Sequence, residues 1–390
     1  MGKIRILFII PTLYHGGTNR VLENILSLIN SEKLDVSVLS LWKSSEKDPY
    51  YAIFSDLSNL VLLEDIAQSF FYNLLYNRFA NKFHGMMRKW FNNNTLLNLC
   101  VEKVHTCIEY KLKPDIIIAF EEGGATLFAS KFKCKKIAWI HCDYSNFLKI
   151  QKPSLDYEHS IYNQFDTIVC VSKYTADSFK RIFRDLSHKV MYIYNPTNAN
   201  SIISKSLEPV DDPICQQDVF NIVSVGRYAE VKQFHLIPDI VRDILKLNDK
   251  VKFRWYIIGD GSEKLKNETL SKIAKYGIEE YVVLLGAREN PYPYMKASNL
   301  YVCTSYSEAY PCVLNEAKVL GLPVVTNNFP SSKEIIDEKS GVIVEFDDIP
   351  LAIANIIKKG DNRCEGVPYS DNKENDNNFI CNQIMSLIER

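Results

Sequence analysis

Short apolar runs rich in β-branched residues recur along almost the whole chain, and segments with helical spacing separate them. In the first half the runs lie at residues 3–10, 35–41, 114–120, 135–141, 166–172 and 189–196. In the second half they lie at residues 219–226, 251–261, 281–286, 299–305, 322–327 and 341–346. Strands this continuously apolar are typical of a parallel sheet covered by helices on both faces. The alternation therefore predicts an α/β fold with two doubly wound domains, one in each half of the chain, with a cleft between them as the natural site.

The domain boundaries follow from where the alternation stops. Residues 195–217 are rich in Asn, Ser, Pro and Asp and show no clear period, which is typical of a linker. We therefore expect a first domain of residues 1–198 and a second of residues 199–372. Residues 359–378 are polar and are expected to form a surface excursion. Residues 373–390 are expected to form a C-terminal helix, whose return to the first domain the sequence leaves open.

Composition excludes several classes of protein. A net charge of -1 gives no reason to expect nucleic acid as a partner. The 10 cysteines are scattered without a C-x-x-C pair or a cluster with His, so they indicate neither a zinc site nor a disulfide framework. No apolar run approaches the ~18 residues that span a bilayer. We expect a cytoplasmic protein whose contact with a membrane, if it has one, is peripheral.

One basic and aromatic segment does not fit the alternation. Residues 66–101 contain no acidic residue, while Arg78, Lys82, Arg88 and Lys89 are mixed with many aromatic side chains. We favour a helical insertion packed on its own domain. The alternative is a basic amphipathic helix that lies on the anionic inner face of a membrane.

Two adjacent glycines, Gly16 and Gly17, separate the first apolar run from a helical pattern. A strand, a glycine turn and a helix start are the parts of an anion site, because the N–H groups of the helix end can face a phosphate. The stretch lacks the three spaced glycines of a dinucleotide fingerprint, so NAD is not indicated. Two interpretations remain, a phosphate-facing turn and an ordinary tight connection.

Polar residues follow two strands of the second half, and ligands of such sheets bind beyond the carboxyl ends of the strands. Gly226 ends the run 219–226, and Arg227 and Lys232 follow it. A guanidinium and an ammonium there could neutralise a diphosphate and stabilise it as a leaving group. The turn Gly259–Asp260–Gly261 comes after the next run, where backbone could approach a flat ring.

The most specific stretch is SEAYPCVLNEAKVLGLPVV, in which seven residues separate Glu308 from Glu316. Pro311 suits the first turn of a helix, which places Glu308 before the helix and Glu316 in its second turn. The amides of Ala309, Tyr310 and Cys312 would open toward whatever Glu308 contacts. Carboxylates beside such a helix end suit the hydroxyl groups of a sugar.

Together these motifs resemble the family 4 retaining glycosyltransferases of the GT-B fold, which has two Rossmann-like domains facing across a cleft. The resemblance covers nearly the whole chain through His-Gly-Gly, WIHCDYS, VSKYTAD, IYNP, VGRYAEVKQ, IIGDG, LLGARENPYPYMKASNLYV and the Glu-x7-Glu stretch. It implies that Arg227 and Lys232 hold the donor diphosphate and assist its departure, while Glu308 and His141 contact the donor sugar. These four residues form the implied catalytic set. The implied donor-binding set is Gly16, Gly17, Gly226, Gly259, Gly261, Ala309, Tyr310, Pro311, Cys312 and Glu316, of which Glu316 binds the ribose and Gly259 and Gly261 lie near the base.

The resemblance also implies an activity. A hexose or N-acetylhexosamine would move from a nucleotide sugar, a UDP-sugar being favoured over a GDP-sugar, to a glycan such as a lipid-linked surface polysaccharide precursor. Transfer would retain the anomeric configuration without a metal or cofactor, the nucleotide sugar being a substrate. In agreement, the sequence has no obvious second carboxylate to pair with Glu308 and no Asp-x-Asp motif. Glu308-Ala309-Tyr310 departs from the Glu-Gly-Phe of many members, which leaves the identity of the sugar open.

Three alternative functions remain in view. The first is a catalytically silent, nucleotide-sugar-binding partner subunit of another glycosyltransferase. The second is an inverting transferase or an epimerase, which would need a carboxylate base in place of His141. The third, a dinucleotide oxidoreductase, is disfavoured because the glycine fingerprint is missing.

Overall fold

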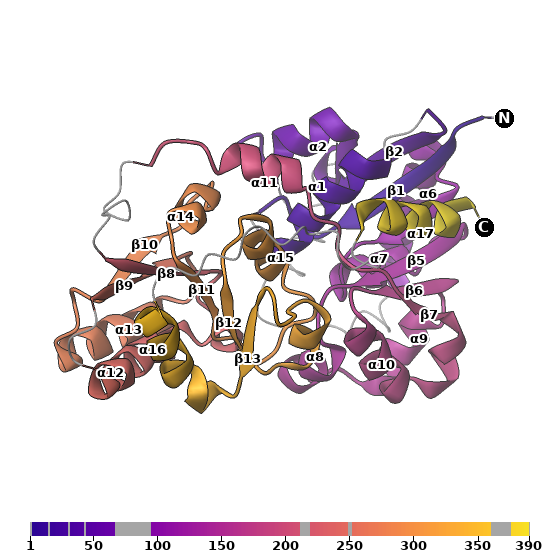
Figure 1. The fold of residues 1–390 in the computed structure, drawn as a ribbon. Helices are drawn as coiled ribbons and strands as arrows, with labels where there is room; N and C mark the ends of the chain where they lie inside the picture. Colours follow the sequence, from indigo (N-terminus) through magenta and orange to yellow (C-terminus); the bar gives the residue numbers. More distant parts are fainter. Residues whose placement is uncertain are drawn as a thin grey trace. The chain divides into compact units, whose positions relative to one another are not determined.

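The chain folds as two compact units, one formed by Met1–Pro196 with Asn377–Arg390 and the other by Thr197–Asp376. The computed structural model describes residues 2–14, 16–29, 32–42, 44–66, 95–210, 219–248, 252–359 and 376–389, with the backbone alone for residues 95–101. Each unit contains its own parallel sheet with helices packed against it (Figure 1). The α/β fold with two doubly wound sheets is therefore confirmed.

The sheet of the first unit has the order β3-β2-β1-β4-β5-β6-β7, and every neighbouring pair is parallel. Its strands are β1 (Ile4–Ile10), β2 (Leu34–Ser40), β3 (Asn59–Leu62), β4 (Ile116–Ala119), β5 (Lys135–Ile140), β6 (Thr167–Cys170) and β7 (Val190–Tyr192). The direction of winding reverses between β1 and β4, and such a switch point is where open α/β sheets bind ligands.

The helices of the first unit connect these strands. They are α1 (Gly17–Ile29), α2 (Tyr51–Leu57), α3 (Leu63–Ile66), α6 (Thr95–Leu112), α7 (Gly124–Ala129), α8 (Tyr144–Gln151), α9 (Leu155–Tyr162), α10 (Lys173–Ile182) and α17 (Asn377–Glu389), with the short 3-10 helix η1 (Arg184–Lys189). The start of α10 is fixed by a capping box in which Ser172 and Thr175 each bond the backbone of the other.

Both faces of this sheet are buried. Leu7 and Ile9 of β1 belong to a core with α6, α7, α9 and α10, while Phe8 and Ile10 on the opposite face have no exposed surface. The C-terminal helix α17 packs on α1 in the same unit, as Figure 1 shows. Lys135 Nζ of β5 also donates to the Leu387 carbonyl at 2.7 Å. The last helix of the chain is thus part of the first unit.

The second unit repeats this topology with the sheet order β10-β9-β8-β11-β12-β13, again all parallel. Its strands are β8 (Phe220–Val225), β9 (Phe253–Ile258), β10 (Val282–Gly286), β11 (Leu300–Cys303), β12 (Val324–Asn327) and β13 (Gly341–Val344). The switch point lies between β8 and β11. The loops that follow these two strands carry Arg227, Lys232 and Glu308.

The second unit is covered by α11 (Ala199–Lys205), α12 (Ile237–Leu247), α13 (Glu263–Tyr276), α14 (Tyr292–Lys296), α15 (Cys312–Val319) and α16 (Ile349–Lys359), with 3-10 helices η3 (Glu230–Lys232), η4 (Phe234–Leu236), η5 (Pro330–Glu334) and η6 (Phe346–Asp348). Helices α12, α13 and α16 lie side by side (Figure 1) and share a core with the sheet. Ser262 caps the start of α13, and Gly277 ends it with a left-handed φ of 63°.

Two elements were not expected from the sequence. The edge strand β3 has only four residues, of which three are apolar and none is fully buried, so its apolar run is too short to stand out. Helix α11 lies within the expected linker 195–217 and packs on α14 and α15, so this part of the linker belongs to the second unit. Helix α12 is preceded by the 3-10 turn η4, and the chain becomes α-helical at Ile237.

Candidate active site

The loops after β8 and β11 meet at the switch point of the second unit. Thr304 Oγ1 donates to the Lys232 carbonyl at 2.6 Å, and the Tyr306 amide donates to the Val231 carbonyl at 3.1 Å. These bonds bring Lys232 next to Glu308, and Lys232 Nζ lies 2.6 Å from Glu308 Oε1. The two side chains are only 19% and 15% exposed, so this ion pair is shielded from solvent on most sides.

The charge of Lys232 is maintained by its partner. Burial is the largest single influence on the pKa of the Lys232 ammonium and lowers it, but the charge of Glu308, its hydrogen bond to Lys232 and the nearby Cys303 together raise the net pKa above its usual 10.5. Lys232 is therefore a fixed cation at neutral pH. Its carboxylate partner keeps further lone pairs that can accept hydrogen bonds from hydroxyl groups.

Arg227 supplies a second cation near Lys232. Its positive charge lowers the pKa of Lys232, which shows that the two groups are close enough to interact. The Arg227 side chain is exposed and, within the described ranges, has no ion-pair or hydrogen-bond partner in the protein. A solvent-facing guanidinium beside a shielded ammonium can bind an anion such as a diphosphate.

Gly259 and Gly261 have a structural role that the sequence did not indicate. They take φ values of 144° and 153°, and a Cβ on Gly259 would collide with the Gly226 carbonyl. A Cβ on Gly261 would collide with the backbone of Tyr228 in the same way. The backbone that approaches this turn is therefore the loop after β8, which carries the predicted phosphate-binding cations. Contact of the turn with a base stays a prediction.

The start of α15 differs in one detail from expectation. Pro311 has a ψ of 108°, which is extended backbone, so it caps the helix and Cys312 is the first helical residue. Glu308 precedes the helix and Glu316 lies in its second turn, as predicted. Ala309 does not take a positive φ, so the alanine causes no backbone strain where many family members have glycine. In the part of the chain that the structure describes, the Ala309 amide has no hydrogen-bond partner.

Glu316 is held by a residue that sequence reasoning missed. The Tyr292 hydroxyl at the start of α14 donates to Glu316 Oε1 at 3.1 Å. Both side chains are buried, with Tyr292 2% and Glu316 8% exposed. Tyr292 lies within the quoted stretch LLGARENPYPYMKASNLYV, but that stretch does not reveal its contact, because its partner lies 24 residues further along the chain.

His141 follows β5 in the first unit. Its amide donates to Glu122 Oε2 at 3.0 Å, and its ring lies 4.5 Å from the Phe120 ring, centre to centre. Burial lowers the pKa of the imidazole to about 3, so the ring is neutral at physiological pH. Its Nε2 atom is buried and, among the described residues, has no hydrogen-bond partner. A neutral ring nitrogen without a protein partner is suited to bind a ligand hydroxyl.

Glu122 is a second residue that sequence reasoning missed. It follows β4, which lies beside β5 in the sheet. A polar residue just after a strand is the signal that could have identified it. The carboxylate holds the backbone of His141 while Phe120, two residues earlier, packs on the ring, so the loop after β4 orients both parts of this histidine.

Gly16 and Gly17 follow β1 in the same unit, and Gly17 is the first residue of α1. Neither takes a positive φ, and a Cβ on either would meet no atom within 4 Å. Asn19 holds the turn instead, because its Nδ2 donates to the Thr12 and Tyr14 carbonyls at 2.9 and 2.8 Å. Neither backbone conformation nor packing within the protein requires the glycines here.

The predicted site residues thus fall into two groups. The second unit brings together Arg227, Lys232 and Glu308, with Glu316 in the adjacent helix. The first unit holds Gly16, Gly17 and His141 after β1 and β5.

Within the basic segment 66–101, residues 67–94 lie outside the described residues. No helix in the described ranges has both the length and the apolar character needed to cross a membrane.

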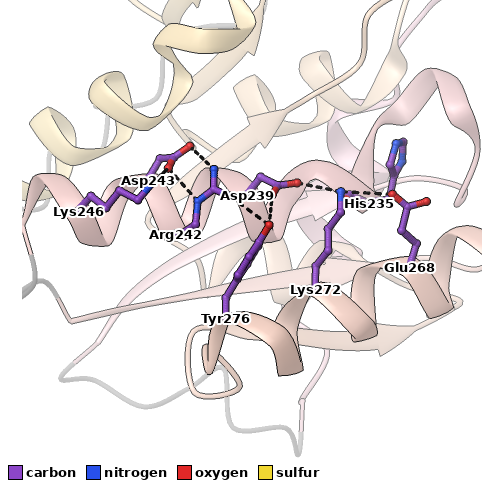
Figure 2. Close-up of polar contacts among 8 residues, drawn as sticks. All are labelled: His235, Asp239, Arg242, Asp243, Lys246, Glu268, Lys272 and Tyr276. Carbon is purple, nitrogen blue, oxygen red and sulfur yellow. Dashed lines mark hydrogen bonds and ion pairs between the residues drawn. The ribbon is translucent and has the colours of Figure 1, made fainter.

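A further polar cluster lies between α12 and α13 (Figure 2). Asp239 accepts bonds from Lys272 Nζ at 2.8 Å, from the Tyr276 hydroxyl at 2.7 Å and from Arg242 Nη1 at 3.3 Å. Lys272 also donates to the His235 carbonyl at 3.0 Å, which ties α13 to the turn before α12. These charges are paired within the protein, so the cluster stabilises the helix pair. Its residues serve as matched controls for substitutions in the candidate site.

Family models match both units of the chain. Residues 15–201 match the model described as Glycosyltransferase Family 4, and residues 219–359 match the one described as Glycosyl transferases group 1. The chain therefore belongs to these glycosyltransferases, as the motifs predicted.

Individual relatives agree with this assignment. The amylovoran biosynthesis glycosyltransferase AmsD of Erwinia amylovora is 23% identical over 344 residues, which are 87% of this chain and 85% of that protein. The N-acetylgalactosamine-N,N'-diacetylbacillosaminyl-diphospho-undecaprenol 4-alpha-N-acetylgalactosaminyltransferase of Campylobacter jejuni is 31% identical over 189 residues. These residues make up 48% of this chain and 48% of that protein, so the chain spans about half of that relative. The crystal structure of Anabaena Alr3699/HepE in complex with UDP and glucose is similar in fold, with a TM-score of 0.73, 18% identity and 99% of both chains covered.

Proposed function

We propose that this glycosyltransferase moves a hexose or N-acetylhexosamine from a nucleoside diphosphate sugar to a glycan. The observation that carries the proposal is the Lys232–Glu308 pair at the switch point of the second unit. A donor substrate has anionic phosphates joined directly to a sugar rich in hydroxyl groups. The shielded cation of Lys232 suits the phosphates, and the Glu308 carboxylate, 2.6 Å away, suits the sugar hydroxyls.

The donor and acceptor are proposed from the relatives. HepE was crystallised with UDP and glucose, which favours a UDP-sugar over a GDP-sugar as the donor. The name of the Campylobacter relative contains a diphospho-undecaprenol, and AmsD is named for amylovoran biosynthesis. A lipid-linked precursor of a surface polysaccharide is therefore the proposed acceptor.

The proposed reaction is retaining and needs no metal. The bond between the anomeric carbon and the diphosphate oxygen breaks, and the acceptor oxygen bonds the same carbon on the same face. The acceptor proton passes to the leaving phosphate, whose growing charge Arg227 and Lys232 offset. Glu308 accepts hydrogen bonds from the sugar hydroxyls, and neutral His141 contributes a hydrogen bond to the sugar. The absence of an Asp-x-Asp motif from the sequence supports metal independence.

Thermal denaturation with a panel of UDP-sugars, GDP-sugars and NAD(P), each with and without EDTA, tests this proposal. A ligand that binds the folded protein raises its denaturation temperature according to its affinity. The proposal predicts an increase with one nucleotide sugar that EDTA does not change and that Glu316→Ala removes. The proposal would be overturned if NAD(P) alone raised the denaturation temperature, or if no nucleotide raised it. Binding without transfer or hydrolysis for any acceptor would indicate a silent partner subunit instead.

A further inference from the structure

Tyr292 and Glu316 form a buried hydrogen bond between two helices that the proposed function does not explain. From this geometry we propose that Tyr292 is a positioning residue, which orients the Glu316 carboxylate for the ribose hydroxyls of the donor nucleotide. The inference rests on the proposed function, because Glu316 is the residue proposed to bind the ribose. It gives a role to a residue of the stretch LLGARENPYPYMKASNLYV to which the resemblance assigned none.

Tyr292 is fixed by hydrogen bonds to residues outside the helix that carries Glu316. Its amide donates to Asn290 Oδ1 at 3.1 Å, and Asn290 Nδ2 donates to the Lys205 carbonyl and to Glu208 Oε2, both at 2.8 Å. Lys205 ends α11, and α11 packs on both α14 and α15. The tyrosine hydroxyl therefore reaches the Glu316 carboxylate from a turn that is anchored elsewhere in the unit.

The effect of this bond on binding follows from the geometry of a carboxylate. A glutamate side chain has three rotatable bonds, and fixing it at the moment of binding costs entropy. The Tyr292 hydroxyl holds Oε1 of the buried carboxylate, which fixes the plane of the group before the ligand arrives. A carboxylate has about four lone-pair positions, so it can accept from Tyr292 and from a ribose hydroxyl together. The affinity that depends on the ribose hydroxyls should fall when Tyr292 no longer donates.

The test uses calorimetry to compare Tyr292→Phe with the wild-type protein in binding UDP and 2′,3′-dideoxy-UDP. GDP and 2′,3′-dideoxy-GDP are measured in parallel. The wild-type protein should prefer the ribose form. Tyr292→Phe should weaken binding of the ribose form roughly three- to tenfold, the effect of about one net hydrogen bond. Binding of the dideoxy form should stay unchanged, so the preference falls by the same factor.

Tyr276→Phe is the matched control. The Tyr276 hydroxyl also donates to a carboxylate, Asp239 Oδ1 at 2.7 Å, but in the cluster between α12 and α13 (Figure 2). This variant should leave both affinities and their ratio unchanged. If Tyr292→Phe behaves like it, or weakens both nucleotides equally, the inference is overturned. A wild-type protein that binds no nucleoside diphosphate would instead overturn the proposed function, and this inference with it.

A double-mutant cycle with Glu316→Gln gives a second measurement that does not depend on the single variant alone. Glutamine replaces one carboxylate oxygen with an NH2 group, which donates and cannot accept, so the two-oxygen carboxylate that Tyr292 orients is lost. If Tyr292 acts through Glu316, Tyr292→Phe should reduce the ribose preference far less in the Glu316→Gln background than in the wild type. If Tyr292→Phe reduces the ribose preference by the same factor in both backgrounds, a positioning role is contradicted.

Discussion

Lys232 Nζ and Glu308 Oε1 lie 2.6 Å apart, although 75 residues of sequence separate the two side chains. The sequence indicated separate partners for them, a diphosphate for the lysine and a sugar for the glutamate. The ion pair means that each residue also sets the charge environment of the other. Removing either one leaves an unpaired charge in a shielded position, which is costly in itself.

Replacement of Lys232 should therefore affect chemistry as well as stability. Lys232→Ala should lower kcat by roughly 10²-fold or more, because it removes a charge that stabilises the leaving diphosphate. Lys272→Ala is the matched control, since Lys272 forms a similarly shielded ion pair with Asp239 at 2.8 Å in the α12–α13 cluster. It should lower the denaturation temperature and leave kcat unchanged. Equal losses of kcat in both variants would show that Lys232 acts only through stability.

Glu122 should matter as a hydrogen-bond acceptor for the His141 amide. Glu122→Gln keeps an oxygen that can accept this bond, so steady-state kinetics should show kcat within about threefold of wild type. Glu122→Ala loses the bond and should lower kcat about tenfold while the donor affinity stays unchanged, an effect comparable to one net hydrogen bond. If glutamine is as damaging as alanine, the negative charge of Glu122 is required, and its function is not limited to holding His141.

The neutral state of His141 should make stability depend on pH in a defined range. The unfolded chain binds a proton on this histidine near its ordinary pKa of 6.5, whereas the folded protein binds it only near 3. Stability is therefore lost as pH falls from about 6.5 toward 3, by about 2 kcal/mol between pH 8 and pH 5. Urea denaturation at these two pH values should show a loss smaller by about this amount in His141→Gln. An equal loss in both proteins would contradict a neutral His141 in the folded protein.

The glycines should separate into two classes. Gly259→Ala should lower the denaturation temperature markedly, because its Cβ would collide with the Gly226 carbonyl at a φ of 144°. Gly17→Ala should leave that temperature unchanged or raise it, since Ala is the better helix former and its Cβ would meet nothing. A fall in transfer rate in Gly17→Ala, without a loss of stability, is expected if this turn faces the donor phosphate. An unchanged transfer rate would indicate that this turn is an ordinary connection between β1 and α1.

Much of the fold could be predicted because its strands are buried on both faces and are therefore continuously apolar. All twelve predicted apolar runs contain strands, from β1 to β13 without β3. The missed strand β3 is a partly exposed edge strand of only four residues, so its run of three apolar residues is too short to identify a strand. Helix α11 was missed because its stability comes from packing on α14 and α15 and is not visible in its polar sequence.

The candidate site was predictable where it follows from strand ends and was not where it depends on long-range contacts. The rule that ligands bind beyond strand ends identified Arg227, Lys232 and Glu308. The same rule could have found Glu122 but could not show that it binds His141. Tyr292 lies in a quoted family motif, but its contact with Glu316 spans 24 residues and the motif did not reveal it. The close approach to Gly259 comes from the protein's own backbone, which only coordinates reveal.

The most direct measurement of the central claim is sugar transfer by the purified protein. It is incubated with each nucleotide sugar, a lipid-linked glycan acceptor and EDTA, and the product linkage is read by NMR. We predict release of the nucleoside diphosphate from one donor, retention of the anomeric configuration and loss of transfer in Lys232→Ala. Inversion of configuration, dependence on a divalent metal, or full transfer by Lys232→Ala would contradict the proposed site and its chemistry.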